Sequence, residues 1–275
     1  MGCRGALGFR LWSALILLLA AASAAAAEPV VGIIIDDLGN RLGTGEQAIG
    51  LPGPVTCSFL PHTPYAKRLA TQAHQGGKEV MLHLPMEAVS GNRLGPGGVT
   101  LHMTHREFVR TVRSDLASVP YARGLNNHMG SLLTRHPGDM GWLMEEIATL
   151  GGLYFVDSRT TAQTVALKVA HENRVPSTSR DVFLDDERDP RAIYRQLMRL
   201  FAIAHSTGKA VGIGHPYPQT LRVLKRIIPH LPTYGIRLVP MSALILPQAH
   251  RALKRWQASL SPSPPAGKSP HPSQS

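Results

Sequence analysis

Apolar runs and helix-start signals alternate along most of this 275-residue chain. Each run is short and rich in aliphatic residues, as expected for strands buried on both faces of a parallel sheet. The runs are residues 30–35, 55–60, 79–84, 122–127, 153–156, 181–184, 210–213 and 236–239. Helical segments separate most of them, and no internal sequence repeat accompanies the alternation. The pattern predicts an α/β protein, most simply a (β/α) barrel of seven to eight strands.

Three polar motifs predict where helices begin. Residues 44–47 and residues 104–107 each match a capping box, in which a threonine and an acid or amide three positions later satisfy free backbone N–H groups. Asp189 followed by Pro190 is typical of an N-cap and first helical residue. We therefore expect helices to start at these three places.

The two ends of the chain differ in composition from the middle. Residues 1–27 combine Arg4 and Arg10, an apolar core and a small-residue stretch, which is the order found in a secretory signal peptide. A retained N-terminal anchor is the alternative, although the core is shorter than the roughly 20 residues that span a bilayer. Residues 248–275 are basic and then rich in proline and serine, and predict a disordered tail. Residues 28–247 form the expected folded domain of a secreted or periplasmic protein.

Composition narrows the classes of function. The formal net charge is +11, but the cations are scattered and no nucleic-acid-binding motif accompanies them. An exported basic protein is instead expected to meet anionic polymers of the cell envelope, and to keep no stable membrane span once the signal peptide is removed. Only Cys57 remains after such processing, which excludes an intramolecular disulfide and a metal–thiolate cluster. Its apolar neighbours predict a buried strand thiol.

Polar residues recur where the predicted strands end. In a parallel barrel these positions share one rim, which is where ligands bind. The residues are Asp36, Asp37, His83, Glu87, Asn126, Asn127, His128, Asp157, Arg159 and His215. A single residue of this kind is unremarkable, but five strands ending this way predict a functional cluster.

The adjacent carboxylates of Asp36 and Asp37 repel each other, and a cation or a hydrogen-bond network is needed to offset this repulsion. The simpler interpretation makes one a helix cap and leaves the other exposed. The alternative is an active site with one metal ligand and one general base. Carboxylates and imidazoles together are typical ligands of zinc in an open catalytic site. Serine catalysis is disfavoured because no Gly-x-Ser-x-Gly elbow is present.

Five motifs in series resemble those of the divergent polysaccharide deacetylase family, distant relatives of the NodB-type carbohydrate esterases. They are Ile-Ile-Ile-Asp-Asp-Leu-Gly (33–39), Met-Leu-His-Leu-Pro-Met-Glu (81–87), Gly-Leu-Asn-Asn-His-Met-Gly-Ser (124–131), Phe-Val-Asp-Ser-Arg-Thr (155–160) and Gly-Ile-Gly-His-Pro (212–216). The resemblance covers about residues 29–246. It implies a distorted (β/α) barrel.

The resemblance also implies roles for individual residues. Asp36 matches the general base, Asp37 a metal ligand and His215 the general acid of the typical esterases. Those esterases have a His-x-x-x-His pair of ligands, and here the second histidine is replaced by Glu87. The ligand that joins Asp37 and His83 is therefore either His128 or Glu87, and the Arg-Pro-Pro-Tyr segment of typical members is absent.

These observations lead to one main hypothesis and two alternatives. The main hypothesis is an exported, metal-dependent hydrolase, with zinc or a similar ion, that removes acetyl groups from a cell-envelope polysaccharide. Asn126, Asn127, Asp157 and Arg159 are expected to bind the substrate. One alternative is a catalytically weak or inactive glycan- or partner-binding protein that keeps the fold, and the other is a hydrolase of a different ester or amide.

Overall fold

The computed structural model describes residues 28–246, so the predicted signal peptide and tail lie outside the described residues. The strands are β1 (Val30–Leu38), β2 (Thr56–Phe59), β3 (Glu79–Met86), β4 (Ala122–Met129), β5 (Tyr154–Asp157), β6 (Ser177–Ser179), β7 (Val182–Phe183), β8 (Lys209–Gly214) and β9 (Arg237–Leu238). The α-helices are α1 (Leu42–Ile49), α2 (Ala66–Gln75), α3 (His105–Ser118), α4 (Pro137–Leu150), α5 (Ala166–Glu172), α6 (Pro190–Thr207) and α7 (Pro218–Ile227). Two 3₁₀ helices are η1 (Leu133–Arg135) and η2 (Ile228–Tyr234).

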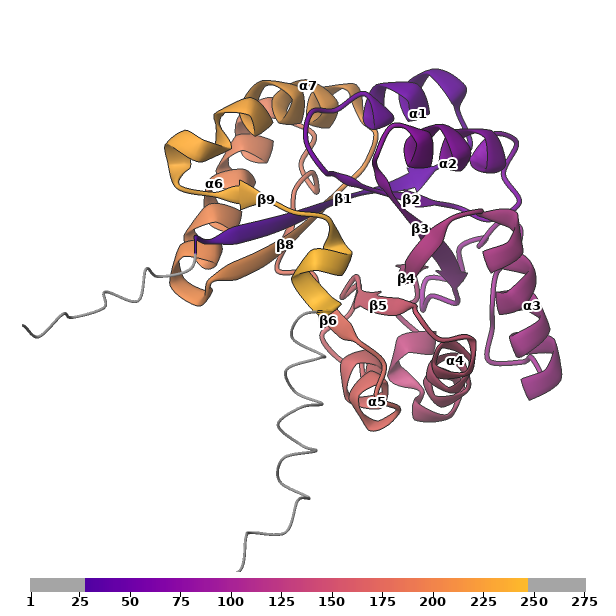
Figure 1. Ribbon diagram of the computed structural model, residues 1–275. Helices are drawn as coiled ribbons and strands as arrows, with labels where there is room; N and C mark the ends of the chain where they lie inside the picture. The colour runs from indigo at the N-terminus through magenta and orange to yellow at the C-terminus, as the bar shows by residue number, and fades with distance from the viewer. Residues whose placement is uncertain (1–27, 247–275) are drawn as a thin grey trace, which may run out of the picture.

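All strand pairs are parallel, and eight strands follow the order β6-β5-β4-β3-β2-β1-β8-β7, with β9 added beside the start of β1. The two edge strands are consecutive in the chain. The link between them spans the remaining gap, because the N–H of Arg180 bonds to the carbonyl of Asp157 on β5 and that of Asp181 to Val211 on β8. The sheet therefore curls into a distorted barrel with the helices outside it (Figure 1), which confirms the predicted fold class.

Two of the three predicted helix starts are correct. Thr104 and Glu107 form the capping box of α3, and the Asp189 carboxylate accepts the N–H of Ala192 at the start of α6. The helix expected from the capping box at residues 44–47 instead begins at Leu42, and its N-cap residue, Arg41, makes no side-chain cap. Leu42 packs against the core, so its burial favours an earlier start than the polar pattern indicates.

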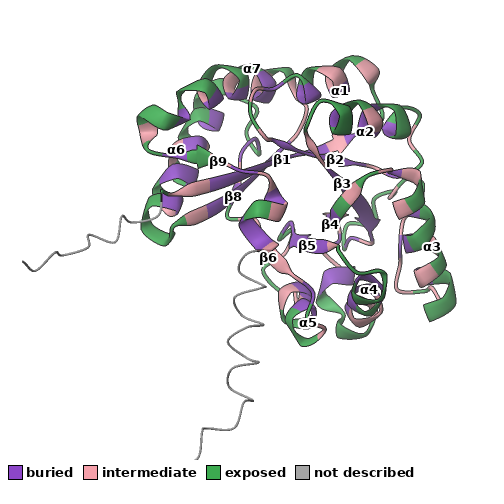
Figure 2. Cartoon of the chain, in the orientation of Figure 1, coloured by how far each residue is buried: buried purple, intermediate pink, exposed green. Residues whose placement is uncertain are grey.

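The hydrophobic core has two layers separated by the sheet. The larger layer lies between the strands and the surrounding helices, and the outward helix faces are exposed (Figure 2). The smaller layer fills the barrel, where Ile34, Val211 and Ile213 contact Met241 and Leu244 of the segment that follows β9. In the described part of the chain, no helix is long and apolar enough to cross a membrane.

Glu79, at the start of β3, closes the end of the barrel opposite the polar strand ends. Its carboxylate accepts hydrogen bonds from the hydroxyls of Thr56 and Tyr154 and from the backbone N–H of Ser242. Burial and the neighbouring Glu79 carboxylate hold the pKa of Tyr154 well above its usual value. This contact ties the segment after β9 to the bottom of the sheet and leaves the other rim open.

Candidate metal centre

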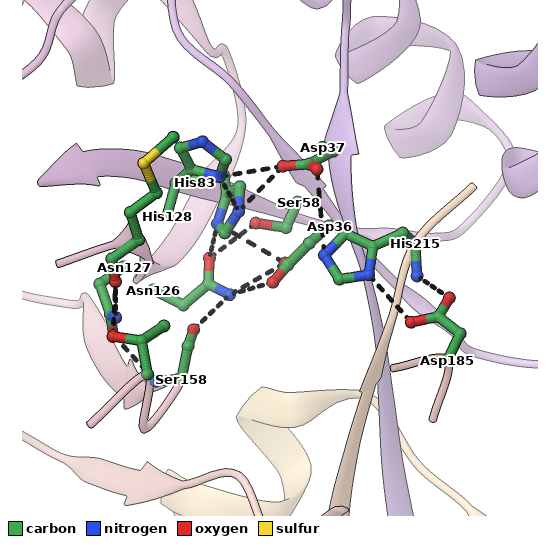
Figure 3. A network of polar contacts seen from close by, with 12 residues as sticks. Asp36, Asp37, Ser58, His83, Asn126, Asn127, His128, Ser158, Asp185 and His215 are labelled. Carbon is green, nitrogen blue, oxygen red and sulfur yellow. Dashed lines mark hydrogen bonds and ion pairs between the residues drawn. The ribbon is translucent and has the colours of Figure 1, made fainter. Parts of the chain in front are cut away.

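The carboxyl ends of four strands bring the central group of polar residues together (Figure 3). Asp36 and Asp37 come from β1, His83 from β3, and Asn126 and His128 from β4, and His215 follows β8. Consecutive strand residues normally face opposite sides of a sheet. Here the β1–β2 register is irregular between Ile35 and Leu38, and Asp37 has a left-handed φ of 57°. This irregularity lets both carboxylates reach the same rim.

Asp37, His83 and His128 form a compact donor group. Oδ1 of Asp37 lies 3.3 Å from Nε2 of His83 and 3.0 Å from Nδ1 of His128, and the two ring nitrogens are 3.1 Å apart. Each residue offers one ligand atom within 4.8 Å of the others. Although Oδ1 of Asp37 is buried, no hydrogen-bond donor of the described residues satisfies it. An unsatisfied carboxylate oxygen beside two imidazole nitrogens fits a divalent cation.

The electrostatics of this group favour a cation. Burial opposes ionisation of Asp37, but the adjacent His128 and His83 rings outweigh it and hold its pKa well below the usual range. Burial likewise lowers the pKa of His83, while the nearby charges of Asp36 and Asp37 raise it above its usual value. The Asp37 carboxylate therefore stays ionised beside the two ring nitrogens, which suits a bound cation.

Asn126 fixes the orientation of His83. Its Nδ2 lies 2.9 and 3.0 Å from the two oxygens of Asp36, and a carboxylate can only accept, so the amide N–H₂ must face Asp36. Its Oδ1 then faces Nδ1 of His83 at 2.8 Å and accepts the ring proton. The lone pair of His83 Nε2 is consequently directed at Asp37, as a metal ligand requires.

Two serines complete this network, and the sequence analysis did not identify them. The Ser58 hydroxyl donates to Oδ1 of Asn126 at 2.7 Å, and Oγ of Ser158 lies 3.2 Å from its Nδ2. Both serines are buried. Ser58 resembles any short polar residue in a strand, so no sequence signal distinguishes it. Ser158 follows a predicted strand within the motif of residues 155–160, which was the available signal.

His215 lies on the other side of Asp37, with Nε2 3.9 Å from Oδ2 of that carboxylate. Its Nδ1 bonds to Oδ1 of Asp185 at 2.9 Å, and the other oxygen of Asp185 accepts the backbone N–H of His215 and the hydroxyl of Thr220. Burial lowers the pKa of His215, but the hydrogen bond and charge of Asp185, together with the charges of Asp36 and Asp37, outweigh burial and raise it to about 9. Asp185 was not predicted as a site residue; its position just after a predicted strand was the available signal.

Glu87 lies outside the donor group, which separates the two alternatives for the third ligand. Its carboxylate accepts the backbone N–H of Leu101 at 2.8 Å. Among the described residues, only His128 joins Asp37 and His83 in a group able to hold a metal ion. The geometry thus favours His128 over Glu87, whose carboxylate stabilises the loop that follows β3.

Three of the four residues expected to bind substrate have internal roles instead. Asn126 is fully buried within the network above. Asn127 is also buried and bonds to the carbonyl of Met129 and the N–H of Ser158. Asp157 accepts hydrogen bonds from Arg159 N–H and from Thr164, and burial raises its pKa. Their atoms are occupied within the protein, so they position neighbours; Arg159 is exposed near the rim.

Beside the donor group, Asp37 and His128 line a groove of about 300 Å³. The structure thus defines an α/β-barrel protein with a candidate divalent-metal centre of one carboxylate and two imidazoles. A groove opens on one side of this centre, and His215, hydrogen-bonded to Asp185, lies on the other. Residues 33–245 match the family profile described as divergent polysaccharide deacetylase, and the chain belongs to this family.

The chain is similar to several known proteins. It is 38% identical to the uncharacterised protein YibQ of Escherichia coli K12 over 215 residues, covering 78% of this chain and 67% of YibQ. The crystal structure of the uncharacterised protein ATU2773 from Agrobacterium tumefaciens C58 superposes with a TM-score of 0.77 at 25% identity, covering 80% of this chain and 91% of the other. The peptidoglycan deacetylase PdaC of Bacillus subtilis shares the fold, with a TM-score of 0.50 at 14% identity and coverages of 85% and 98%.

Proposed function

We propose that this protein is an exported, metal-dependent hydrolase that removes acetyl groups from a polysaccharide of the cell envelope. The observation that carries the proposal is the convergence of Asp37, His83 and His128 between two further groups suited to proton transfer. These are the Asp36 carboxylate on one side and the Asp185-backed imidazole of His215 on the other. A hydrolase needs both a base and an acid around its reacting carbonyl.

The residues have distinct roles in this proposal. Asp37, His83 and His128 would hold the ion, and zinc suits one carboxylate and two imidazoles. The bound ion supplies Lewis acidity that activates water and polarises the acetyl carbonyl. Asp36, whose two oxygens are held by the amide of Asn126, accepts a proton from the attacking water. His215, held by Asp185, donates a proton to the leaving nitrogen or oxygen as its bond to the acetyl carbonyl carbon breaks. The products are acetate and the free amine or alcohol.

Two further observations support the substrate and the location. PdaC, which shares the fold, is described as a peptidoglycan deacetylase. The predicted signal peptide of residues 1–27 and the net positive charge that remains without Arg4 and Arg10 suit a protein that meets anionic material in the secreted or periplasmic space. A polysaccharide of the envelope is therefore the proposed partner.

The test is acetate release from N-acetylated and O-acetylated glycan fragments by the zinc-loaded protein. We expect the wild type to release acetate and Asp36→Asn to lose at least about 100-fold in kcat, the lower end of what a general base contributes. Equal release by the two proteins would refute the role of Asp36. Glycan binding that survives chelation, without any turnover, would instead support a binding protein that keeps the deacetylase fold.

A further inference from the structure

The groove beside the candidate metal centre carries one exposed cation. Its walls come from the loop after β2 (Leu60, Pro61 and Thr63) and from the glycine-rich loop after β3 (Arg93, Leu94, Gly95 and Pro96). Asp37 and His128 lie at its metal-binding side. Apart from these two residues, Arg93 is the only ionisable residue that lines it. A ligand that extends from the metal centre along the groove would therefore meet a guanidinium.

The loop that carries Arg93 is anchored at both ends. Glu87 N–H bonds to the carbonyl of Val99, Val99 N–H bonds to that of Pro85, and the Glu87 carboxylate accepts the N–H of Leu101. Glu87, which matches the position of the second histidine of the typical esterases, thus holds the loop through Leu101. The base of the loop is thus part of the folded core, which restricts where Arg93 can lie.

Near its end, this loop also packs against Asp115 of α3. Gly97 has a φ of 75° and approaches Asp115 so closely that an added Cβ would lie 2.3 Å from its Oδ1. The same carboxylate contacts Nε2 of His62, in the loop after β2, at 2.9 Å. Asp115 of α3 therefore contacts both loops that form the walls, and it fixes their relative position.

Within residues 28–246, no acidic side chain forms an ion pair with the exposed Arg93. Two more guanidinium groups lie on the other side of the centre, around His215. Arg188 lies 3.9 Å from the ring centroid of Tyr217, and Arg180 lies 5.1 Å from that of Phe183.

Both aromatic rings contact His215, with ring centroids 5.5 Å away for Tyr217 and 5.2 Å away for Phe183. Arg188 is exposed, and the neighbouring Glu187 pairs with Arg195 instead. Cations therefore flank the candidate centre both along the groove and beside His215.

We infer that the polysaccharide substrate is acidic, and that Arg93 binds a carboxylate or phosphate on a sugar next to the one that is deacetylated. Arginine presents a planar fork of donors that pairs with both kinds of anion. This inference rests on the proposed function, because it names the substrate class of the same site.

The experiment compares three defined oligosaccharides with the zinc-loaded protein. One is a neutral oligomer of N-acetylglucosamine, the second alternates N-acetylglucosamine with glucuronic acid, and the third carries phosphate on alternate sugars. Acetate release gives kcat/KM, and calorimetry gives Kd for each oligomer whether or not turnover occurs. The variants are Arg93→Gln, Arg93→Lys and the control Arg226→Gln, whose side chain lies on α7 outside this groove.

We expect the wild type to favour at least one acidic oligomer about tenfold over the neutral one. Arg93→Gln should remove most of this preference, with a much larger loss on the acidic oligomer than on the neutral one, while Arg93→Lys should keep part of it. The difference between the carboxylated and phosphorylated oligomers identifies the anion. Absence of a preference in the wild type, or equal losses on all three oligomers in Arg93→Gln, would overturn the inference.

Failure of the proposed function has a different signature. If no oligomer releases acetate, the deacetylase proposal fails. The Kd values then still decide the acidic-substrate inference, because a preference for an acidic oligomer that depends on Arg93 supports it and equal Kd values refute it. A preference that decreases with added salt is expected, since the proposed contact lies in a groove that is open to solvent.

Discussion

Nδ1 of His83 lies 2.8 Å from Oδ1 of Asn126, and this hydrogen bond determines which ring nitrogen faces Asp37. The amide cannot be turned around, because its Nδ2 already donates to Asp36. Asn126 therefore links the proposed base to a proposed metal ligand. One neutral side chain thus orients two residues. It donates to the Asp36 carboxylate, and it accepts the His83 ring proton so that the other ring nitrogen presents its lone pair.

Replacing Asn126 tests this link. Asn126→Ala leaves His83 Nδ1 without its acceptor and Asp36 without its donor, so we expect zinc affinity to fall about 10- to 100-fold, as is usual when a group that orients a ligand is removed. Calorimetric titration with zinc measures the effect. Asn126→Asp keeps the volume but puts a second acid beside Asp36, and should also weaken activity. Asn173→Ala, which removes a hydrogen bond to Val169 on α5, is the matched control and should bind zinc normally.

The identity of the third ligand is tested by a pair of variants. His128→Ala removes one atom of the donor group, so we expect it to lower zinc affinity by about 100-fold or more, beyond what loss of an orienting group costs. Glu87→Gln should retain zinc within about twofold, because its carboxylate bonds to Leu101. Equilibrium dialysis followed by metal analysis distinguishes the two. Zinc loss in Glu87→Gln with retention in His128→Ala would reverse the assignment.

Asp185 is expected to act through His215. Asp185→Asn should lower kcat about 100-fold with little change in KM, because the imidazole loses the group that orients it and stabilises its protonated form. Asp185 holds the pKa of His215 above its usual value. A general acid is active below its pKa, so the high-pH decline in rate should move to lower pH in the variant than in the wild type. Asp186→Asn changes the adjacent exposed acid and should leave the pH–rate profile unchanged.

Glu79 is predicted to stabilise the end of the barrel away from the centre. Glu79→Ala leaves the buried Tyr154 hydroxyl and the Ser242 N–H without their acceptor, which should cost about 1–3 kcal/mol of unfolding free energy. Denaturant unfolding monitored by circular dichroism measures it. Glu46→Ala, which removes an exposed ion pair with Arg68, should stay within about 0.5 kcal/mol of the wild type. A smaller loss in Glu79→Ala than in Glu46→Ala would contradict the role of Glu79.

Much of the fold was predictable because its signals are local. Apolar runs and glycine stops mark the strands and helix ends, and the cap at Thr104 satisfies backbone groups within four residues. The start of α1 was predicted incorrectly because burial of Leu42 outweighed a polar pattern at residues 44–47. The motifs also indicated the rim residues, since parallel strands end at one edge whatever lies between them.

The partners of those rim residues were not predictable in the same way. Asn126 and Asp157 were expected to face substrate, but whether a polar side chain points outward or bonds inside depends on neighbours from other strands. The roles of Ser58, Ser158 and Asp185 were missed because each depends on a contact with a residue far away in the sequence. Asn126 lies 68 positions from Ser58 and 32 from Ser158, and His215 lies 30 positions from Asp185.

The sequence by itself determined an α/β barrel and the set of acids and imidazoles on one rim, because each strand and the position of its end depend on a few consecutive residues. Only the tertiary structure decided that His128, and not Glu87, joins Asp37 and His83. The reason is geometric: β1 is irregular at Asp36 and Asp37, and β3 and β4 are in a register that brings His83 beside Asn126. Distances between side chains on different strands depend on that register, which no single segment specifies.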